Sequence, residues 1–235
     1  MKTFSILTPS RNRPDRLKQF IDSVYTLAAF PNNVEMIVYV DLDDPRLADY
    51  KQLEANQEHN VVFLFGEHMS ISKSWNSLAK LSTGNVLIMG NDDLLYRTSA
   101  WDKSLDLELD LYPDDIYCAW MEDKINGESH CAFPIVSRLW YETLGYFAPG
   151  VFNFGYNDTW VFDIAQRVDR CHFIPHIIAE HMHFSANKSK FDDTYARNRT
   201  QERGNLYHKD KDIYEATREQ RHGDAQKLLA VIRSI

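Results

Sequence analysis

The 235-residue chain is predicted to be α/β, with a mostly parallel central sheet flanked by helices, small antiparallel additions and C-terminal helices. Two observations predict this fold class. Apolar stretches alternate with helix-prone stretches through residue 90, and such alternation produces a parallel sheet with right-handed crossovers. Hydrophobic residues make up 44% of the chain, which is enough for a sizeable core, and no linker divides it. We therefore expect a single domain over residues 1–235.

The first half of the chain supplies the parallel strands. Four short apolar stretches are predicted strands, at residues 4–8, 36–40, 61–65 and 86–89. A helix is predicted from Pro14 to Ala28, because proline is tolerated in a first turn and apolar residues follow at helical spacing. Residues 46–58 are helix-prone. Ser70 or Ser72 is a candidate N-cap for a third helix.

The second half is less regular. Further strands are expected at residues 116–121, 131–133 and 177–184. Further helices are expected at residues 137–144, 157–168, 212–221 and 224–235. The aromatic stretch 146–156 is predicted to be a loop, and the polar stretch 185–210 is predicted to be mobile.

Composition excludes several functional classes. The formal net charge of −8 argues against a general nucleic-acid-binding protein. Residues 185–235 differ, because they hold 11 Lys and Arg residues against 8 Asp and Glu residues, and this segment is able to meet phosphate. The three cysteines form no CxxC pair, so neither a zinc ribbon nor a disulfide framework is indicated. With no signal-peptide pattern and no membrane-length apolar run, we expect a cytoplasmic protein.

Two adjacent carboxylates, Asp92 and Asp93, closely follow the predicted strand at residues 86–89. Open α/β sheets bind ligands in the crevice beyond the carboxyl ends of their strands. Hard oxygen ligands in that place suit Mg²⁺ or Mn²⁺, and a metal there suits a diphosphate. The run Asn91-Asp92-Asp93 is equally typical of a polar turn, so the metal interpretation needs support from elsewhere in the chain.

Asp41 and Asp43 lie two residues apart at the end of another predicted strand, so both side chains can face the same side. A carboxylate there is suited to accept a hydrogen bond from a nucleobase N–H. The alternative is a turn, which the pair Asp44-Pro45 favours by itself.

His181 and His183 also lie two residues apart on a predicted strand, which points both imidazoles to one face. Such a pair indicates a metal site, with hydrogen-bonded structural histidines as the alternative. Asp158 follows the aromatic loop and is a candidate general base, although Asn157-Asp158 is also an ordinary helix start. Lys188, Arg197 and Arg199 lie in a basic segment that is suited to close over a diphosphate. The alternative is a solvated surface.

The order of these motifs resembles that of family 2-like glycosyltransferases with the GT-A fold. The resemblance covers about residues 3–200 and rests on the segments Ile6-Leu7-Thr8-Pro9-Ser10-Arg11-Asn12-Arg13-Pro14, Val38-Tyr39-Val40-Asp41, Ser74-Trp75-Asn76-Ser77-Leu78-Ala79, Met89-Gly90-Asn91-Asp92-Asp93 and Gly155-Tyr156-Asn157-Asp158-Thr159-Trp160. His183 lies where many such enzymes have a metal-binding histidine. The chain departs from the family pattern at Asn91 and Asn157, where amides replace acids.

The resemblance implies transfer of a sugar from a nucleotide-diphosphate donor, most often UDP-linked, with Mn²⁺ or Mg²⁺. Asp93 and His183 are expected to hold the metal, with His181 as the alternative histidine. Asp158 is expected to deprotonate an acceptor hydroxyl for an inverting attack. The expected donor-binding residues are Pro9, Ser10, Arg11, Asp41, Asp43, Asn76, Asp92, Lys188, Arg197 and Arg199.

The resemblance also implies a division of the domain. Residues 1–96 are expected to form the nucleotide-binding half, residues 97–184 the acceptor half, and residues 185–235 a flexible loop with C-terminal helices. Apolar faces for the sugar or acceptor are expected from Trp101, Phe154 and Trp160.

Two acceptor classes fit the resemblance as close competitors. One is a glycan or small molecule, and the other is hydroxymethylcytosine in DNA, as for bacteriophage enzymes that act in the host cytoplasm. The alternative function is a non-catalytic nucleotide- or glycan-binding protein on the same fold, which the amides at Asn91 and Asn157 support. A nucleotidyltransferase or metal phosphohydrolase ranks last, because no phosphate-cradling glycine loop is evident. The oligomeric state is not predicted.

Overall fold

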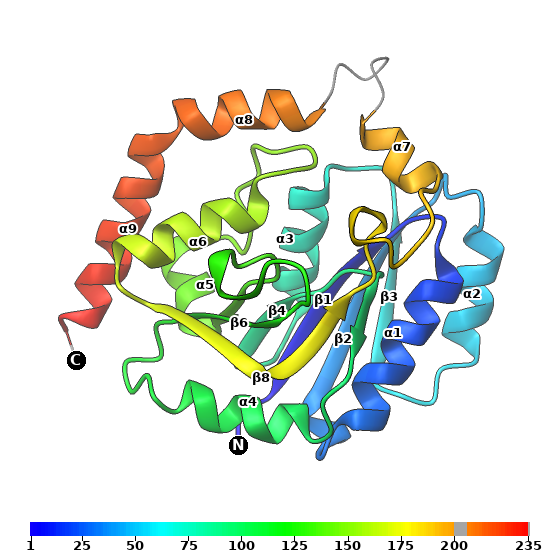
Figure 1. Ribbon diagram of the computed structural model, residues 1–235, viewed down its shortest axis with the longest axis horizontal. Helices are drawn as coiled ribbons and strands as arrows, with labels where there is room; N and C mark the ends of the chain where they lie inside the picture. Colours follow the sequence, from blue (N-terminus) through cyan, green and yellow to red (C-terminus); the bar gives the residue numbers. More distant parts are fainter. Residues whose placement is uncertain (200–205, 235) are drawn as a thin grey trace.

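The computed structural model describes residues 1–199 and 206–234, without the side chains of residues 198 and 199. Within this range an eight-stranded sheet has the order β3-β2-β1-β4-β7-β6-β8-β5 (Figure 1). The strands are β1 (Phe4–Ser10), β2 (Val34–Asp41), β3 (Val61–Gly66), β4 (Val86–Met89), β5 (Leu94–Tyr96), β6 (Cys118–Glu122), β7 (Ile135–Ser137) and β8 (Cys171–His181). The helices are α1 (Pro14–Leu27), α2 (Leu47–Ala55), α3 (Ile71–Leu81), α4 (Trp101–Leu109), α5 (Arg138–Leu144), α6 (Asn157–Arg167), α7 (Asp193–Arg199), α8 (Leu206–Ala216) and α9 (Arg218–Ile232).

The predicted fold class is confirmed. β1 pairs in parallel with β2 and β4, and β2 pairs in parallel with β3. These four strands therefore end at one edge of the sheet, which brings together Ser10, Asp41 and the residues that follow Met89. The expected antiparallel additions are also present, because β7 runs antiparallel to β4 and β6, and β5 runs antiparallel to β8.

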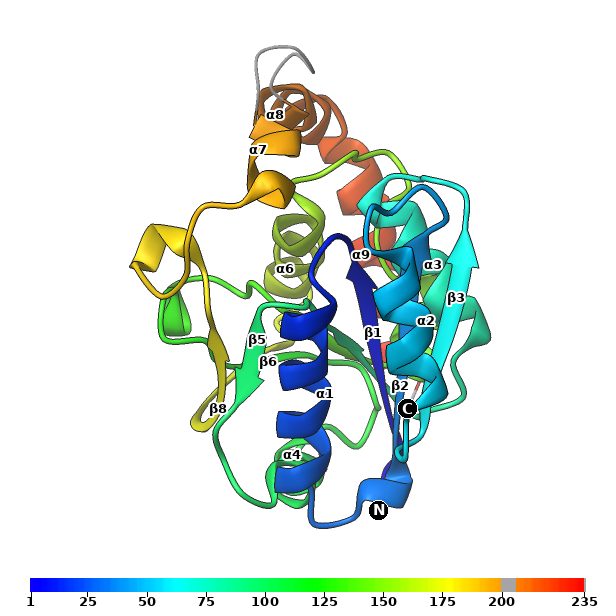
Figure 2. The ribbon, with the colours of Figure 1, turned by 90° about the vertical axis from the view of Figure 1, so that its right-hand side faces the viewer.

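Helices cover both faces of the sheet, which explains why β1, β2 and β4 are almost wholly buried. Phe4 and Ile6 of β1 pack in one core with α1, α2 and α4, whereas Leu7 packs in a second core with α3, α5, α6 and α9. Figure 1 shows α1 and α2 on one side of the sheet, with α5 and α6 on the other. Figure 2 shows α1 above α4 on the first side.

Gly90 allows the chain to leave β4 close against β1. Its N–H donates to the carbonyl oxygen of Leu7 at 2.9 Å. A Cβ atom at this position would collide with Oγ1 of Thr8 and would lie 3.1 Å from the Leu7 carbonyl oxygen. The close approach therefore requires glycine, and it delivers the carboxylate pair directly beside the end of β1.

Several predicted boundaries are wrong in the second half. Residues 131–133 are not a strand, because Pro134 cannot donate to a ladder and the strand begins only at Ile135. β8 is longer than predicted at its start and ends at His181, so His183 lies outside it. The pattern does not predict the early part of β8, because Pro175 interrupts the apolar run. In the structure, the pairing of β8 with β6 changes register around this proline. The short β5 and the helix α4 were not predicted.

The C-terminal segment contains more helix than expected. The stretch 185–210, predicted to be mobile, contains α7 and the start of α8, while residues 200–205 lie outside the described range. The predicted break between the two closing helices falls at Thr217, earlier than expected. Among the described helices, none combines the length and apolar character that crossing a membrane requires.

Candidate active site

A cavity of about 700 Å³ lies at the edge where β1, β2 and β4 end. The opposite wall comes from the loop before α6, from the start of that helix and from the segment around His130. The predicted site residues that line this cavity are Pro9, Ser10, Arg11, Asp41, Asp92, Asp93, Asp158, His181, His183 and Arg197. The structure thus brings together residues from the beginning, middle and end of the chain.

The carboxylate pair forms the buried floor of the cavity, with Asp92 3% and Asp93 2% exposed. Asp92 accepts hydrogen bonds from Ser10 Oγ at 2.7 Å and from the Arg13 guanidinium at 3.1 Å. Asp93 accepts a hydrogen bond from the Tyr195 hydroxyl at 2.7 Å. Its other oxygen lies 3.3 Å from His181 Nε2. The two neighbouring carboxylates therefore have different hydrogen-bond partners.

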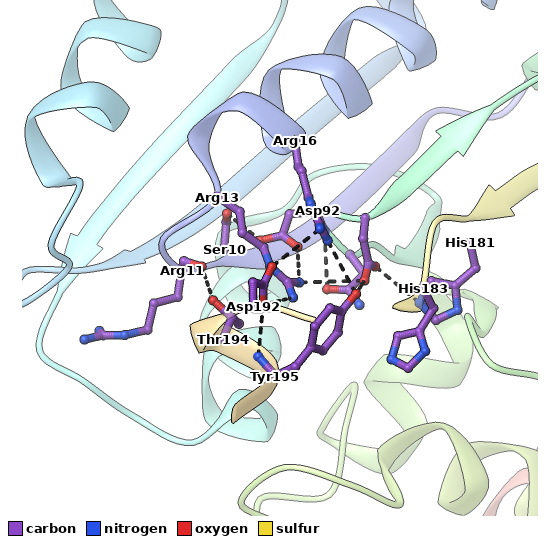
Figure 3. Close-up of polar contacts among 12 residues, drawn as sticks. Ser10, Arg11, Arg13, Arg16, Asp92, His181, His183, Asp192, Thr194 and Tyr195 are labelled. Atoms are coloured by element: carbon purple, nitrogen blue, oxygen red, sulfur yellow. Dashed lines mark hydrogen bonds and ion pairs between the residues drawn. The ribbon is translucent and has the colours of Figure 1, made fainter. Parts of the chain in front are cut away.

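Arg13 connects the carboxylate pair to α7 (Figure 3). Its guanidinium lies 3.1 Å from Asp92 and 3.7 Å from Asp93, and it also donates to Asp192 at 2.8 and 2.9 Å. The Tyr195 ring covers this guanidinium, with its centroid 4.1 Å from the Arg13 Cζ atom. The buried cation thus offsets the negative charge of three carboxylates and holds the start of α7 against the cavity.

Their surroundings move the pKa values of the two carboxyl groups apart. Burial raises the pKa of Asp92 to about 6, against the opposing effect of the Arg13 charge. Burial also acts on Asp93, but contacts with His181, Tyr195 and Arg13 outweigh it and hold the pKa of Asp93 below its ordinary value. Asp93 is therefore the more strongly ionised of the pair and the better candidate for a metal ligand.

The donor atoms beside Asp93 fit a divalent metal in part. Asp93 Oδ1 and His181 Nε2 are both buried and have no hydrogen-bond partner among the described residues. Their separation of 3.3 Å matches two ligands that share one ion at roughly 2.1 Å each. No cluster of three or more His, Cys, Asp or Glu metal-binding side chains is present in the described part of the chain. A metal here would need ligands from substrate or water, as Mg²⁺ sites commonly have.

The two histidines lie next to each other, although His183 is outside the strand. Their ring centroids are 4.9 Å apart. His183 Nδ1 lies 2.7 Å from Ser185 Oγ, and the ring also packs against Tyr195. His181 is thus the histidine that the structure places directly against Asp93.

At the end of β2, Asp41 is held by two cationic or polar neighbours. Arg11 donates to Asp41 at 2.6 Å, and His68 Nδ1 lies 2.9 Å from the same oxygen. Arg11 also contacts Asp43, and this hydrogen bond holds the pKa of Asp43 below its ordinary value. Asp43 does not line the cavity. Asp44 accepts from the backbone N–H groups of Asn12 and Arg46, as a turn residue does.

Asp158 lies in the first turn of α6 and is paired with a histidine that was not predicted. Asp158 Oδ2 is 2.9 Å from His130 Nε2, and both residues line the cavity. The side chains are 28% and 30% exposed, so both groups remain accessible. The hydrogen bond to Asp158 raises the pKa of His130 above its ordinary value of 6.5.

Besides Asp43, two predicted site residues, Asn76 and Lys188, lie outside the cavity. Asn76 does not line the cavity, because its amide binds the backbone of Phe147 and Ala148. Lys188 also lies outside the cavity and pairs with Glu180 at 2.9 Å. Asn157, where an amide replaces an acid of the family pattern, lines the cavity but is only 2% exposed, and its oxygen accepts from Ser72. The side chain of Arg199 lies outside the described residues, so its predicted role stays a prediction.

Two of the three expected apolar faces are wrong. Trp101 and Trp160 are fully buried core residues, whose indole N–H groups donate to the Val24 carbonyl oxygen and the Tyr146 hydroxyl. Phe154 does line the cavity. The residues that sequence reasoning missed are Arg13, His68, His130, Asp192 and Asp210, and of these only Arg13 had a local signal, two residues after Arg11 in the same turn.

The loop opposite the carboxylate pair is held by Asp210 of α8. This fully buried carboxylate accepts backbone hydrogen bonds from Asn153, Phe154 and Gly155 at 3.1, 2.7 and 2.9 Å. Gly155 is packed so closely that a Cβ atom there would lie 2.9 Å from the Tyr207 ring. α8 therefore fixes one wall of the cavity.

Comparison with known proteins agrees with this arrangement. The chain matches the family described as Glycosyl transferase family 2 over residues 5–167. No curated protein matches it. It is similar in fold to the mannosyltransferase PcManGT from Pyrobaculum calidifontis, solved with GDP-Man and Mn2+, with 15% identity and a TM-score of 0.60. It is also similar to S. aureus TarS 1–349, solved with UDP-GlcNAc, with 13% identity and a TM-score of 0.61.

These similarities extend over most of this chain but not over most of each relative. The aligned region covers 77% of this chain and 56% of the PcManGT chain, and 82% of this chain and 63% of the TarS chain. At such low identity the solved structures show the shared fold alone. The family match covers well over half of the chain, and the protein therefore belongs to glycosyl transferase family 2.

Proposed function

We propose that this protein transfers a sugar from a UDP-linked donor to an acceptor hydroxyl, with a divalent metal and with inversion at the anomeric carbon. The observation that carries the proposal is that one cavity is lined by Asp41, Asp93 and Asp158, which come from three separate segments of the chain. Each offers a carboxylate suited to one part of the reaction: the nucleoside, the diphosphate and the acceptor hydroxyl.

The donor wall consists of Ser10, Arg13, Asp41, Asp92 and Asp93. Asp41 keeps an oxygen for a nucleobase N–H while Arg11 and His68 fix the carboxylate. Asp93 and His181 would hold Mn²⁺ or Mg²⁺, with His183 alongside. The metal, when bound, offsets negative charge on the leaving diphosphate.

The acceptor wall consists of His130, residues 153–156 and Asp158. Asp158 takes the proton of the acceptor hydroxyl, and the acceptor oxygen then attacks the anomeric carbon from the side opposite the diphosphate. The bond between that carbon and the diphosphate breaks, and its electron pair leaves with UDP. Arg197 lines the cavity and supplies positive charge for the departing diphosphate.

We further propose an uncharged acceptor such as a glycan. In the described part of the cavity, its Lys and Arg side chains are those of Arg11, Arg13 and Arg197, and none comes from the acceptor wall. Arg11 and Arg13 are already paired with carboxylates on the donor side. Phe133, Phe154, Tyr156 and Tyr207 line the same cavity as Asp158, and aromatic rings suit a sugar face better than a DNA backbone.

A donor screen tests the proposal. Purified protein would be incubated with UDP-glucose, UDP-N-acetylglucosamine and GDP-mannose, with Mn²⁺ or with a chelator, and released UDP or GDP would be measured. We expect release from a UDP-sugar that the chelator abolishes. Binding of UDP without release from any donor would favour the non-catalytic alternative, and release of pyrophosphate or phosphate would contradict a glycosyl transfer.

The acceptor is tested in the same assay. We expect oligosaccharides or simple sugars to accelerate UDP release over water, and DNA containing hydroxymethylcytosine to have no effect. Acceleration by the modified DNA alone would contradict the glycan assignment while leaving glycosyl transfer intact.

A further inference from the structure

His130 and Asp158 form a hydrogen-bonded pair on the acceptor wall of the cavity. They come from separate segments: Asp158 lies in the first turn of α6, and His130 directly follows the short 3-10 helix at Gly127–Ser129. His130 Nε2 lies 2.9 Å from Asp158 Oδ2, within hydrogen-bond range. The imidazole is also fixed from the side by the edge of the Phe162 ring, at 5.7 Å between centroids.

Asn157, the amide next to Asp158, cannot replace Asp158 as the group that meets a substrate hydroxyl. Asn157 is buried at the cavity wall, and its side chain is already engaged: its oxygen accepts from Ser72 and its NH₂ group donates to the carbonyl oxygens of Phe154 and Gly155. Asp158 Oδ1, by contrast, is approached only by the hydroxyl of its neighbour Thr159 at 3.4 Å in the described contacts. One oxygen of Asp158 is therefore held by His130, and the other is available to a substrate hydroxyl.

The charged groups that act on His130 are Asp158 from α6 and Asp123 from the turn after β6. Asp123 is bound by the backbone N–H groups of Ile125 and Asn126, and despite its burial these bonds hold its pKa below the ordinary value. Asp123 therefore stays ionised near neutral pH. The hydrogen bond and charge of Asp158 raise the pKa of His130 above its ordinary value, against the opposing effect of burial.

We infer that His130 is a positioning residue that orients Asp158 and controls its strength as a base, so that sugar transfer requires His130 to be uncharged. This inference rests on the proposed function. Protonated His130 holds Asp158 in an ion pair and weakens its affinity for a further proton. Neutral His130 still donates its Nε2–H to Oδ2 and keeps the carboxylate oriented, while Oδ1 regains its basicity.

The proposed step starts with the His130 imidazole uncharged. The acceptor O–H bond breaks and its proton moves to Asp158 Oδ1. The acceptor oxygen bonds to the anomeric carbon as the bond from that carbon to the diphosphate oxygen breaks, and the electron pair leaves with UDP. His130 donates the same hydrogen bond throughout and returns Asp158 to its starting orientation after the proton passes to solvent.

The test compares two pH titrations of the wild-type protein. One follows UDP release by water from UDP-N-acetylglucosamine or UDP-glucose, whichever is turned over faster. The other follows the His130 ring by NMR. We expect the rate to fall by about tenfold or more between pH 8.5 and pH 6, with a midpoint that matches the His130 titration. Midpoints that differ by more than one pH unit would overturn the inference.

Three variants sharpen the test. His130→Gln retains an N–H donor without a titrating charge, and we expect its rate to change less than about twofold over the same pH range. His176→Gln is the matched control, because it removes an exposed histidine paired with Glu108 outside the cavity and leaves the wild-type profile. In Asp158→Asn, the His130 midpoint should move to lower pH.

Contrary results distinguish a failure of the proposed role of His130 from a failure of the proposed function. A His130→Gln profile with the wild-type acid limb, or an unchanged His130 midpoint in Asp158→Asn, would refute the role of His130. If wild-type protein released no nucleoside diphosphate from any donor, the proposed function would fail instead, and the NMR midpoint in Asp158→Asn would still decide whether the pair exists.

Discussion

The donor wall and the acceptor wall of the cavity are built in different ways. Ser10 and Asp41 end neighbouring parallel strands and Asp93 follows a third, so strand pairing brings their backbones together. The acceptor wall is irregular and depends on buried polar contacts from distant parts of the chain, above all Asp210. Single substitutions should therefore disturb the acceptor wall more easily than the donor wall.

The largest effect is expected when the proposed base is removed. Asp158→Asn should lower the rate of UDP release by roughly 10² to 10⁴-fold, because the amide cannot accept the acceptor proton. UDP affinity should stay within about twofold of wild type, since Asp158 lies on the acceptor wall. Steady-state rates and UDP calorimetry check both parts, and equal loss of rate and of UDP binding would break the distinction between the walls.

A large effect on stability is expected at Asp210. Asp210→Asn should lower the free energy of unfolding by about 3 kcal/mol, because an NH₂ group would face backbone N–H groups that now donate to a buried carboxylate. Urea denaturation measures this, with exposed Asp212→Asn as the control. UDP affinity of the folded variant should not change, and a change above tenfold would show that the walls are coupled.

A smaller effect is expected at Tyr195. Tyr195→Phe removes the hydroxyl that donates to Asp93, so a metal and diphosphate meet less competition there. We expect the Mn²⁺-dependent affinity for UDP to rise by about fivefold, the equivalent of one hydrogen bond. Tyr112→Phe, whose ring packs against His172 away from the cavity, is the control. Weaker binding of UDP by Tyr195→Phe would instead indicate that the Tyr195 hydroxyl contributes to donor binding.

The smallest effect is a pH dependence of stability at His130. Because its folded pKa is raised, the pair with Asp158 stabilises the fold fully below the unfolded pKa of about 6.5, and this contribution is lost as pH rises through the folded pKa. His130→Gln should therefore cost more stability at pH 5.5 than at pH 8.5, by less than about 1 kcal/mol for a partly exposed pair. Thermal unfolding at the two pH values, beside His176→Gln, checks the sign.

The same comparison explains what could be predicted from the sequence. Asp92 and Asp93 were found because an apolar strand ends just before them, which is a local signal. The contact between Arg13 and Asp192 spans 179 positions, and that between His130 and Asp158 spans 28, so no local pattern reveals either. Asn76 belongs to one of the motifs, but it does not line the cavity, because its amide binds the backbone of a loop 72 positions away.

Binding of UDP measured by calorimetry with and without Mn²⁺ tests the central claim most directly. The account predicts Mn²⁺-dependent binding for wild type and Asp158→Asn, and loss of the Mn²⁺ dependence for Asp93→Asn. Wild-type protein that does not bind UDP, or Asp93→Asn with undiminished Mn²⁺ dependence, would contradict the assignment of this cavity as a metal-assisted nucleotide-sugar site.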